Sequence, residues 1–261
     1  MALVALFVFA SCKKNTGVTN QPYEAYGTPA NKGQLKVNLA FAYAIDYANL
    51  RIKLNGAYVS NLLQSRTPFP GGGFNTRGSN FALYMSVPLG SNAVSIVMPK
   101  FGTNVDSVVL FSTNVNITDN TPQTLHLTDT AANMKSVLVR NNINNIADGM
   151  CRFNFVHLMP NVPAVDLYLN GVLMRANIPY LGASGAMDIP VGINAPGFVS
   201  GATTTWAVRA AGATATSPAL VSFASASGLI SGAALTGFCM GYSGATGARL
   251  PFLAMTLDKN Q

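Results

Sequence analysis

The feature that most restricts the fold of this chain is an internal repeat. Residues 49–56 read Asn-Leu-Arg-Ile-Lys-Leu-Asn-Gly, and residues 164–171, which lie 115 positions later, read Ala-Val-Asp-Leu-Tyr-Leu-Asn-Gly. In both segments apolar residues alternate with polar ones, which is the pattern of a strand with one buried face. Each ends in Asn-Gly, a pair that tolerates positive φ at both positions of a tight hairpin turn. The repeat therefore predicts two copies of one β unit.

A second pair of matching segments fixes the spacing within each copy. Val-Pro-Leu-Gly at residues 87–90 corresponds to Ile-Pro-Val-Gly at residues 189–192, at an offset of 102, so the first copy holds 13 extra residues between the landmarks. We place them in residues 64–80, where two prolines and three consecutive glycines predict a long loop. Pro88 and Pro190 indicate strand ends or edge positions.

The rest of the chain also favours strands, and no segment has a convincing helical period. We predict an all-β chain with two tandem immunoglobulin-like β-sandwich domains, residues 35–141 and 150–261, arranged as two beads. The boundary is the Asn-rich stretch 141–149. One barrel made from both copies is less favoured, because each copy has enough strands by itself. The further predicted strands are residues 93–98, 108–117, 124–128, 136–140, 205–210, 219–224, 235–240 and 253–257.

The N-terminus resembles that of an exported lipoprotein. Residues 1–11 are an apolar run that is shorter than the roughly 20 residues of a membrane span and is typical of a secretory signal. Ala10 and Ser11 before Cys12 resemble the bacterial lipobox, which implies cleavage before Cys12 and lipidation of its thiol. Phe9 replaces the usual Leu and a basic n-region is missing, which suggests a start codon further upstream. The alternative is a buried strand with an incidental cysteine.

Residues 12–34 are predicted to form the lipid anchor and a flexible tether, because they are rich in Asn, Thr, Gly and Pro. An ordered strand near residues 23–26 is the alternative. We expect a cell-envelope protein that is bound to the membrane through the lipid on Cys12. The expected location is the periplasmic or the surface face of the outer membrane of a Gram-negative bacterium.

The composition fits such a protein and argues against nucleic-acid binding. The 261 residues are 49% hydrophobic, enough to bury one or two cores, and only 10% are charged, compared with about 25% in typical soluble domains. The net charge is +7, but Lys13-Lys14 is the only adjacent basic pair. Nucleic-acid binding requires clustered basic residues. A weak preference for anionic surfaces remains open.

Residues 155–171, which read Phe-Val-His-Leu-Met-Pro-Asn-Val-Pro-Ala-Val-Asp-Leu-Tyr-Leu-Asn-Gly, resemble a family of bacterial envelope proteins. It is catalogued as domain of unknown function four-three-nine-seven. Its members carry a similar stretch in tandem β modules, and the resemblance is clearest in the second copy. It implies an immunoglobulin-like fold and an anchored location, and it implies no activity and no site residues.

Candidate catalytic and metal-binding residues are few. His157 and Asp166 flank one predicted turn, but Ala42 and Arg51 stand at the corresponding positions of the first copy, so we expect structural hydrogen bonds from both. His126 is expected to point away from its apolar neighbours. Two distant histidines without an acidic cluster predict no metal site.

The remaining motifs also argue against an enzyme. Residues 182–185 lack the spacing of a serine-nucleophile turn, residues 241–247 lack the Lys-Ser/Thr pair of a phosphate-binding loop, and Glu24 is the only Glu. A hydrolase is the least favoured hypothesis, and no cofactor is expected. The alternation of side chains along the two strands predicts that one of the residues Cys151 and Cys239 points inward and the other outward. A disulfide between them is the alternative.

The leading hypothesis is a non-catalytic binding, adhesion or scaffolding module that has an envelope protein or a glycan as its partner. The alternative is an accessory component of a polysaccharide-capture or secretion system. Trp206 is expected in a core, because it lies in a strand-like segment. The aromatic residues of predicted loops, Phe69, Phe74 and Tyr180, are the weak candidates for a binding surface.

Overall fold

The computed structural model describes residues 31–42, 49–103, 105–191, 204–225 and 229–260. Within these ranges it has eighteen strands and two short 3-10 helices, η1 (Ala131–Asn133) and η2 (Gly247–Arg249). No helix in the described ranges is long and apolar enough to span a membrane. The predicted signal, Cys12 and most of the predicted tether lie outside the described residues.

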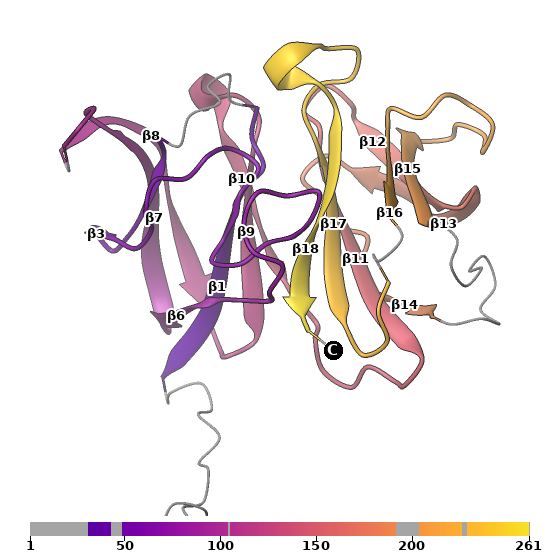
Figure 1. The fold of residues 1–261 in the computed structure, drawn as a ribbon, viewed down its shortest axis with the longest axis horizontal. Coiled ribbons are helices and arrows are strands. Elements are labelled where there is room, and N and C mark those ends of the chain that lie inside the picture. The colour runs from indigo at the N-terminus through magenta and orange to yellow at the C-terminus, as the bar shows by residue number, and fades with distance from the viewer. Residues whose placement is uncertain (1–30, 43–48, 104, 192–203, 226–228, 261) are drawn as a thin grey trace, which may run out of the picture.

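The strands form two β-sandwiches, each made of an outer and an inner sheet (Figure 1). The first outer sheet has the order β3 (Ala57–Tyr58), β2 (Arg51–Leu54), β7 (Gly90–Pro99), β8 (Asp106–Ile117). The first inner sheet has the order β10 (Lys135–Arg140), β9 (Pro122–Thr128), β1 (Lys32–Leu39), β4 (Pro68–Phe69), and β6 (Met85–Pro88) also pairs with β1.

The second sandwich repeats this arrangement. Its outer sheet has the order β13 (Val172–Pro179), β12 (Ala164–Leu169), β15 (Thr204–Ala210), β16 (Val221–Ser225). Its inner sheet has the order β14 (Met187–Pro190), β11 (Met150–Leu158), β17 (Ala234–Met240), β18 (Phe252–Lys259), β5 (Gly73–Phe74). β1 pairs with β9 in parallel, as β11 does with β17, and the other pairings are antiparallel. The all-β prediction is confirmed.

The repeated segments occupy equivalent places in the two sandwiches. Asn55 and Gly56 have φ of 50° and 85° between β2 and β3, and Asn170 and Gly171 have φ of 48° and 81° between β12 and β13. Both Asn-Gly pairs therefore form the tight hairpin turn that the sequence predicts. The two proline landmarks end β6 and β14, which pair with equivalent strands, β1 and β11.

Each sandwich encloses its own apolar core. Alternate residues of β1 and β9 meet those of β2, β7 and β8 in the first core. In the second, Trp206 is fully buried, and its ring stacks on that of Phe153 with a centroid distance of 4.1 Å. The prediction that Trp206 lies in a core is confirmed.

The two inner sheets pack against each other, so the molecule has four layers of strands (Figure 1). We call the side chains between these sheets the central layer. Its apolar part includes Ala40, Val139, Val156 and Phe238. The sandwiches are therefore joined along a buried face, and the expected two beads are not separate. The second faces of strands such as β9 and β17 carry apolar and threonine side chains and His126 rather than charged groups. Both strands are therefore buried along their whole length.

A segment of the first copy crosses to the second sandwich. The predicted long loop, residues 64–80, contains β4, which pairs with β1, and β5, which pairs with β18. A Cβ atom on Gly73 would lie 2.0 Å from the carbonyl oxygen of Met255. Only glycine allows the two backbones to approach this closely, so the extra residues of the first copy form an edge strand of the second inner sheet.

The boundaries of the two copies in the structure can be compared with the predicted ones. β10 ends at Arg140 and β11 begins at Met150, on either side of the Asn-rich stretch. β1 begins at Lys32, inside the range predicted as tether, because Gly33 pairs with Val87 of β6.

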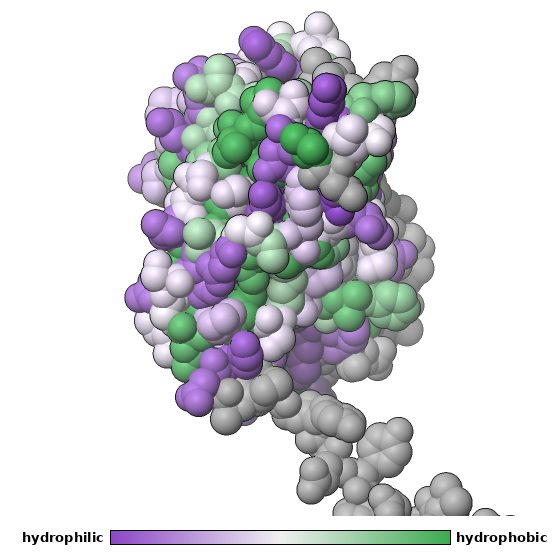
Figure 2. Space-filling model, turned by 90° about the vertical axis from the view of Figure 1, so that its left-hand side faces the viewer, coloured by the Kyte–Doolittle hydropathy of each residue, from purple (hydrophilic) through white to green (hydrophobic). Residues whose placement is uncertain are grey.

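The outer face of the first sandwich carries apolar side chains among polar ones (Figure 2). Val108 and Val109 of the edge strand β8 are exposed, as is Phe101 in the turn before it. Apolar side chains scattered over a surface are usual in proteins and indicate no function by themselves.

Candidate functional site

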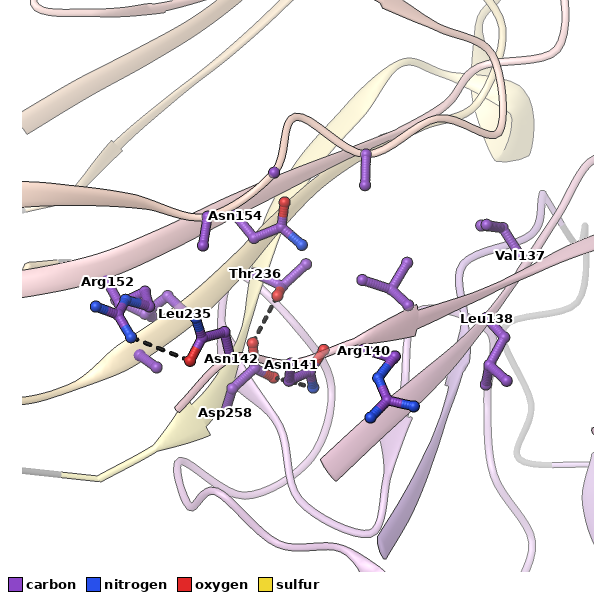
Figure 3. Close-up of a pocket in the computed structure, with 15 residues that line it drawn as sticks. Val137, Leu138, Arg140, Asn141, Asn142, Arg152, Asn154, Leu235, Thr236 and Asp258 are labelled. Carbon is purple, nitrogen blue, oxygen red and sulfur yellow. Dashed lines mark hydrogen bonds between the residues drawn. The ribbon is translucent and has the colours of Figure 1, made fainter. Parts of the chain in front are cut away.

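A cleft of about 540 Å³ lies at one end of the central layer. Strand β10 forms one side, and β11, β17 and residues 183–186 form the other. Figure 3 shows side chains from both sides. The volume lies within the range of roughly 300–1,000 Å³ that small-molecule sites occupy. The side chains that line it include Val137, Leu138, Arg140, Asn141, Thr236 and Asp258.

Asp258 is the centre of a buried polar network at this cleft. Its Oδ1 accepts hydrogen bonds from Thr256 at 3.2 Å and from the Tyr84 hydroxyl at 3.2 Å. Its Oδ2 accepts one from Thr236 at 2.5 Å (Figure 3). The Asp258 side chain is 3% exposed. A buried carboxylate requires such partners, because water no longer solvates it.

Lys36 supplies the opposite charge. Its Nζ lies 3.4 Å from Asp258 Oδ1 and donates to the carbonyl of Leu257 at 2.5 Å. The side chain of Lys36 has no exposed surface. Burial lowers the pKa of Lys36, and the nearby carboxylate of Asp258 acts in the opposite direction. The network therefore pairs both of its charges.

Asn141 connects this network to the cleft. Its Nδ2 donates to the Tyr84 hydroxyl at 2.8 Å, to Thr124 Oγ1 at 2.8 Å and to Asp258 Oδ1 at 3.1 Å. The residue lines the cleft and is 3% exposed. Its Oδ1 has no hydrogen-bond partner among the described residues. Leaving a buried acceptor unpaired costs about 1–3 kcal/mol, so this oxygen suits a donor from a bound molecule.

The two arginines at the cleft are paired with carboxylates. Arg140 Nη2 lies 2.6 Å from Asp119 Oδ2, and Arg152 Nε lies 2.7 Å from Asp188 Oδ1. Arg152 also donates to Asn142 Oδ1 at 3.1 Å (Figure 3). The arginines hold the pKa of Asp119 at about 2 and lower that of Asp188. Every ionic side chain of the cleft thus has a counter-ion, and the site is close to neutral.

His157 and Asp166 lie away from the cleft, and each makes turn hydrogen bonds. One ring nitrogen of His157 bonds the carbonyl of Val162 at 2.8 Å, and the other accepts the amide of Met159 at 3.3 Å. Asp166 accepts the amides of Asn177 and Gly212. The structural role expected for both residues is confirmed.

Cys239 Sγ lies 3.4 Å from His157 Nδ1, but the pair lacks the character of a nucleophile and its base. Both side chains are fully buried. Burial raises the pKa of Cys239 to about 12 and lowers that of His157. A reactive cysteine needs the opposite shifts. By strand register, two paired leucines, Leu39 and Leu127, stand at these positions in the first sandwich. Leu39 thus replaces Ala42 as the counterpart of His157.

Cys151 and Cys239 both lie in the second core as free thiols. The expectation that one points outward is wrong. Cys239 does point away from Phe238 and Met240, but those two residues face the central layer, so both sides of β17 are buried. Cys151 is near one end of β11 and Cys239 pairs with His157 near the other. Six residues of strand separate them by about 20 Å, which no disulfide can bridge.

His126 points away from Leu125 and Leu127, as predicted, and it faces the central layer. Its Nδ1 lies 3.0 Å from Asn38 Nδ2, and its ring is tilted against that of Phe238 at 6.0 Å. Burial lowers the pKa of His126 to about 3. In the described ranges, no three His, Cys, Asp or Glu side chains gather in a way that could hold a metal ion.

The aromatic candidates for a binding surface lie outside the cleft. Phe69 in β4 packs against the first core and Phe74 in β5 against the second, so both belong to strands rather than to a loop. Tyr180 follows β13, and its ring lies edge-on to His157 at 6.0 Å. Burial raises its pKa to about 12. All three are half-buried.

Sequence reasoning missed the residues of the cleft. Asp258 and Thr236 occupy the second face of β18 and β17, where a polar residue indicates exposure to solvent. The one available signal was the run of Asn after β10, which was interpreted as a boundary. Asn141 is the residue of that run that reaches the buried network.

The comparison with protein families finds a match for part of the chain. Residues 75–168 match the domain of unknown function DUF4397. This is the family that the sequence resembles, so the suspected family is confirmed. The match lies mostly in the first sandwich, and the prediction that the resemblance is clearest in the second copy is not confirmed. The DUF4397 match begins after β5 and ends in β12. It crosses from the first sandwich into the second and includes β10 and the first half of the cleft lining. No curated protein matches the chain.

Proposed function

We propose that this protein is a non-catalytic binding or scaffolding module of the cell envelope and that the cleft is its binding site. The proposal rests on three features that the cleft combines. A cavity of about 540 Å³ has mostly apolar walls, paired charges and one buried acceptor without a partner, Asn141 Oδ1. Binding sites are commonly concave, largely apolar and supplied with a few polar groups that orient the ligand.

A binding role fits the titratable groups better than a catalytic one does. General acids and bases work best with pKa values near the ambient pH and need access to substrate. Burial instead lowers the pKa of His126 to about 3 and raises that of Cys239 to about 12. Both groups are thus held in their neutral forms.

The cleft is tested by filling it. Ala186 lines the cleft and is exposed, so Ala186→Trp places a large side chain in its mouth. Ala132→Trp in η1, also exposed and outside the cleft, is the matched control. We expect Ala186→Trp to abolish binding to arrays of envelope glycans and synthetic peptides, and Ala132→Trp to leave it unchanged. Turnover of an envelope substrate by the purified protein would contradict the proposal.

The membrane anchor is tested separately. The sequence around Cys12 supports lipidation of its thiol, and residues 1–30 lie outside the described part. Cells grown with a palmitate analogue should label the full chain but not Cys12→Ser. Equal labelling of both would show that Cys12 is not the lipid site.

A further inference from the structure

Strand β10 has a free hydrogen-bonding edge. In an antiparallel pair, successive residues direct their backbone groups alternately toward the partner strand and away from it. The amide of Asn141 donates to the carbonyl of Pro122, and Val139 and Val137 occupy the equivalent positions further along β10. The backbone N–H and C=O groups of Leu138 and Arg140 therefore point away from β9. In the described part of the chain, no strand pairs with that side of β10.

This free edge borders the cleft. Six consecutive residues, 137–142, line the cavity, whereas one face of a strand contributes only alternate residues. The facing wall includes Ala183, Gly185 and Ala186. These small residues leave room beside β10 for the side chains of another strand. Exposed sheet edges pair readily with an added strand unless charge, proline or a covering segment prevents it.

The chemistry of the cleft restricts what such a strand can be. The paired charges make the site close to neutral, so a charged side chain would be desolvated there without a counter-ion. The apolar walls, among them Val137 and Val139, favour small apolar side chains. Asn141 Oδ1 is an acceptor without a partner among the described residues. None of the described residues that line the cleft carries an aromatic ring on which a sugar could stack.

We propose that the cleft binds an extended, uncharged segment of a partner polypeptide, which adds to the free edge of β10 as a further strand of the first inner sheet. This inference rests on the proposed function, since it names the class of partner for the same cleft. The backbone groups of Leu138 and Arg140 supply affinity for any extended chain. Asn141 and the apolar walls select its side chains.

Substitution of Leu138 separates strand addition from other binding at the cleft. Leu138→Pro removes one N–H that no described residue uses and places a ring at the free edge, which an edge strand tolerates. Leu138→Ala is the matched control, because it removes the same partly buried side chain and keeps the N–H. The probe is an array of uncharged six-residue peptides, the length of β10, in which valine alternates with serine, threonine or asparagine.

We expect the full chain to bind members of the array, and Leu138→Pro to bind them at least about tenfold more weakly than Leu138→Ala does. In hydrogen exchange, the amides of Leu138 and Arg140 should exchange quickly in the free protein and become protected with peptide. Methylation of alternate peptide nitrogens should abolish binding.

Failure of this proposal can be distinguished from failure of the proposed function. If no peptide binds a protein with a normal melting curve, or if Leu138→Pro binds as well as Leu138→Ala, strand addition is wrong. If glycans then bind and Ala186→Trp abolishes this, the binding function stands with another ligand class. If neither peptides nor glycans bind, both proposals are wrong.

Discussion

Lys36 of β1 and Asp258 of β18 form an ion pair of 3.4 Å between the two sandwiches, and both side chains are almost completely buried. The two residues are 222 positions apart in the sequence. Buried ion pairs contribute little net stability compared with apolar groups, but removal of one partner is costly, because the other charge is left without compensation. The pair therefore restricts how the two inner sheets can pack.

Replacement of Lys36 should destabilise the whole molecule. In Lys36→Met the Asp258 carboxylate stays buried without its counter-ion, and we expect the free energy of unfolding to fall by about 3–5 kcal/mol. Urea titration followed by circular dichroism measures this loss. Lys36→Met combined with Asp258→Asn, which removes the orphaned charge, should recover a large part of it. Unchanged stability of Lys36→Met would show that the pair does not form in solution.

The shared central layer predicts that both sandwiches unfold together. Trp206, the only Trp, reports on the second core, whereas far-ultraviolet circular dichroism reports on all strands. Their urea transitions should coincide. Phe238→Ala opens a cavity in the central layer and should cost about 3–5 kcal/mol. Two separate transitions in the unaltered protein would contradict a common folding unit.

Stability should decrease with acidity below about pH 6.5. Burial lowers the pKa of His126 from 6.5 to about 3, so between these values the unfolded chain binds a proton that the folded chain does not. Unfolding is then favoured as the pH falls, by up to about 1.4 kcal/mol per pH unit for this residue. Urea midpoints between pH 7 and pH 4.5 measure the slope, above the titration of most carboxylates. His126→Gln should make it shallower, while an equal slope would exclude His126 as its source.

Both core thiols should be unreactive in the folded protein. Burial raises the pKa of Cys151 to about 11 and that of Cys239 to about 12, and reagents cannot reach them. In a Cys12→Ser background, Ellman's reagent at pH 8 should label neither thiol until denaturant is added. Two thiols per chain should then react without any reductant. Fewer than two would indicate a disulfide or another modification.

The sequence predicts the repeated parts of the fold better than the parts that join them. Strands and Asn-Gly turns follow from local patterns, and residues such as Ile52 and Leu167 identify the core faces of equivalent strands. The central layer does not follow from local patterns, because a lysine such as Lys36 within an alternating strand indicates a solvent-facing position. Its burial depends on Asp258, which no local pattern connects to it. The cleft was missed for the same reason, since its lining comes from both copies.

The contact between β5 and β18 sets an order on folding during synthesis. β5 is synthesised well before β18, the last described strand. Phe74 and its neighbours therefore have no partner strand while the intervening chain is made. Neither sandwich has its full set of contacts until β18 arrives, because the same strand completes one sheet and brings Asp258 to Lys36. A fragment that ends at residue 251 should thus be a target for proteases and chaperones although it contains the whole DUF4397 match.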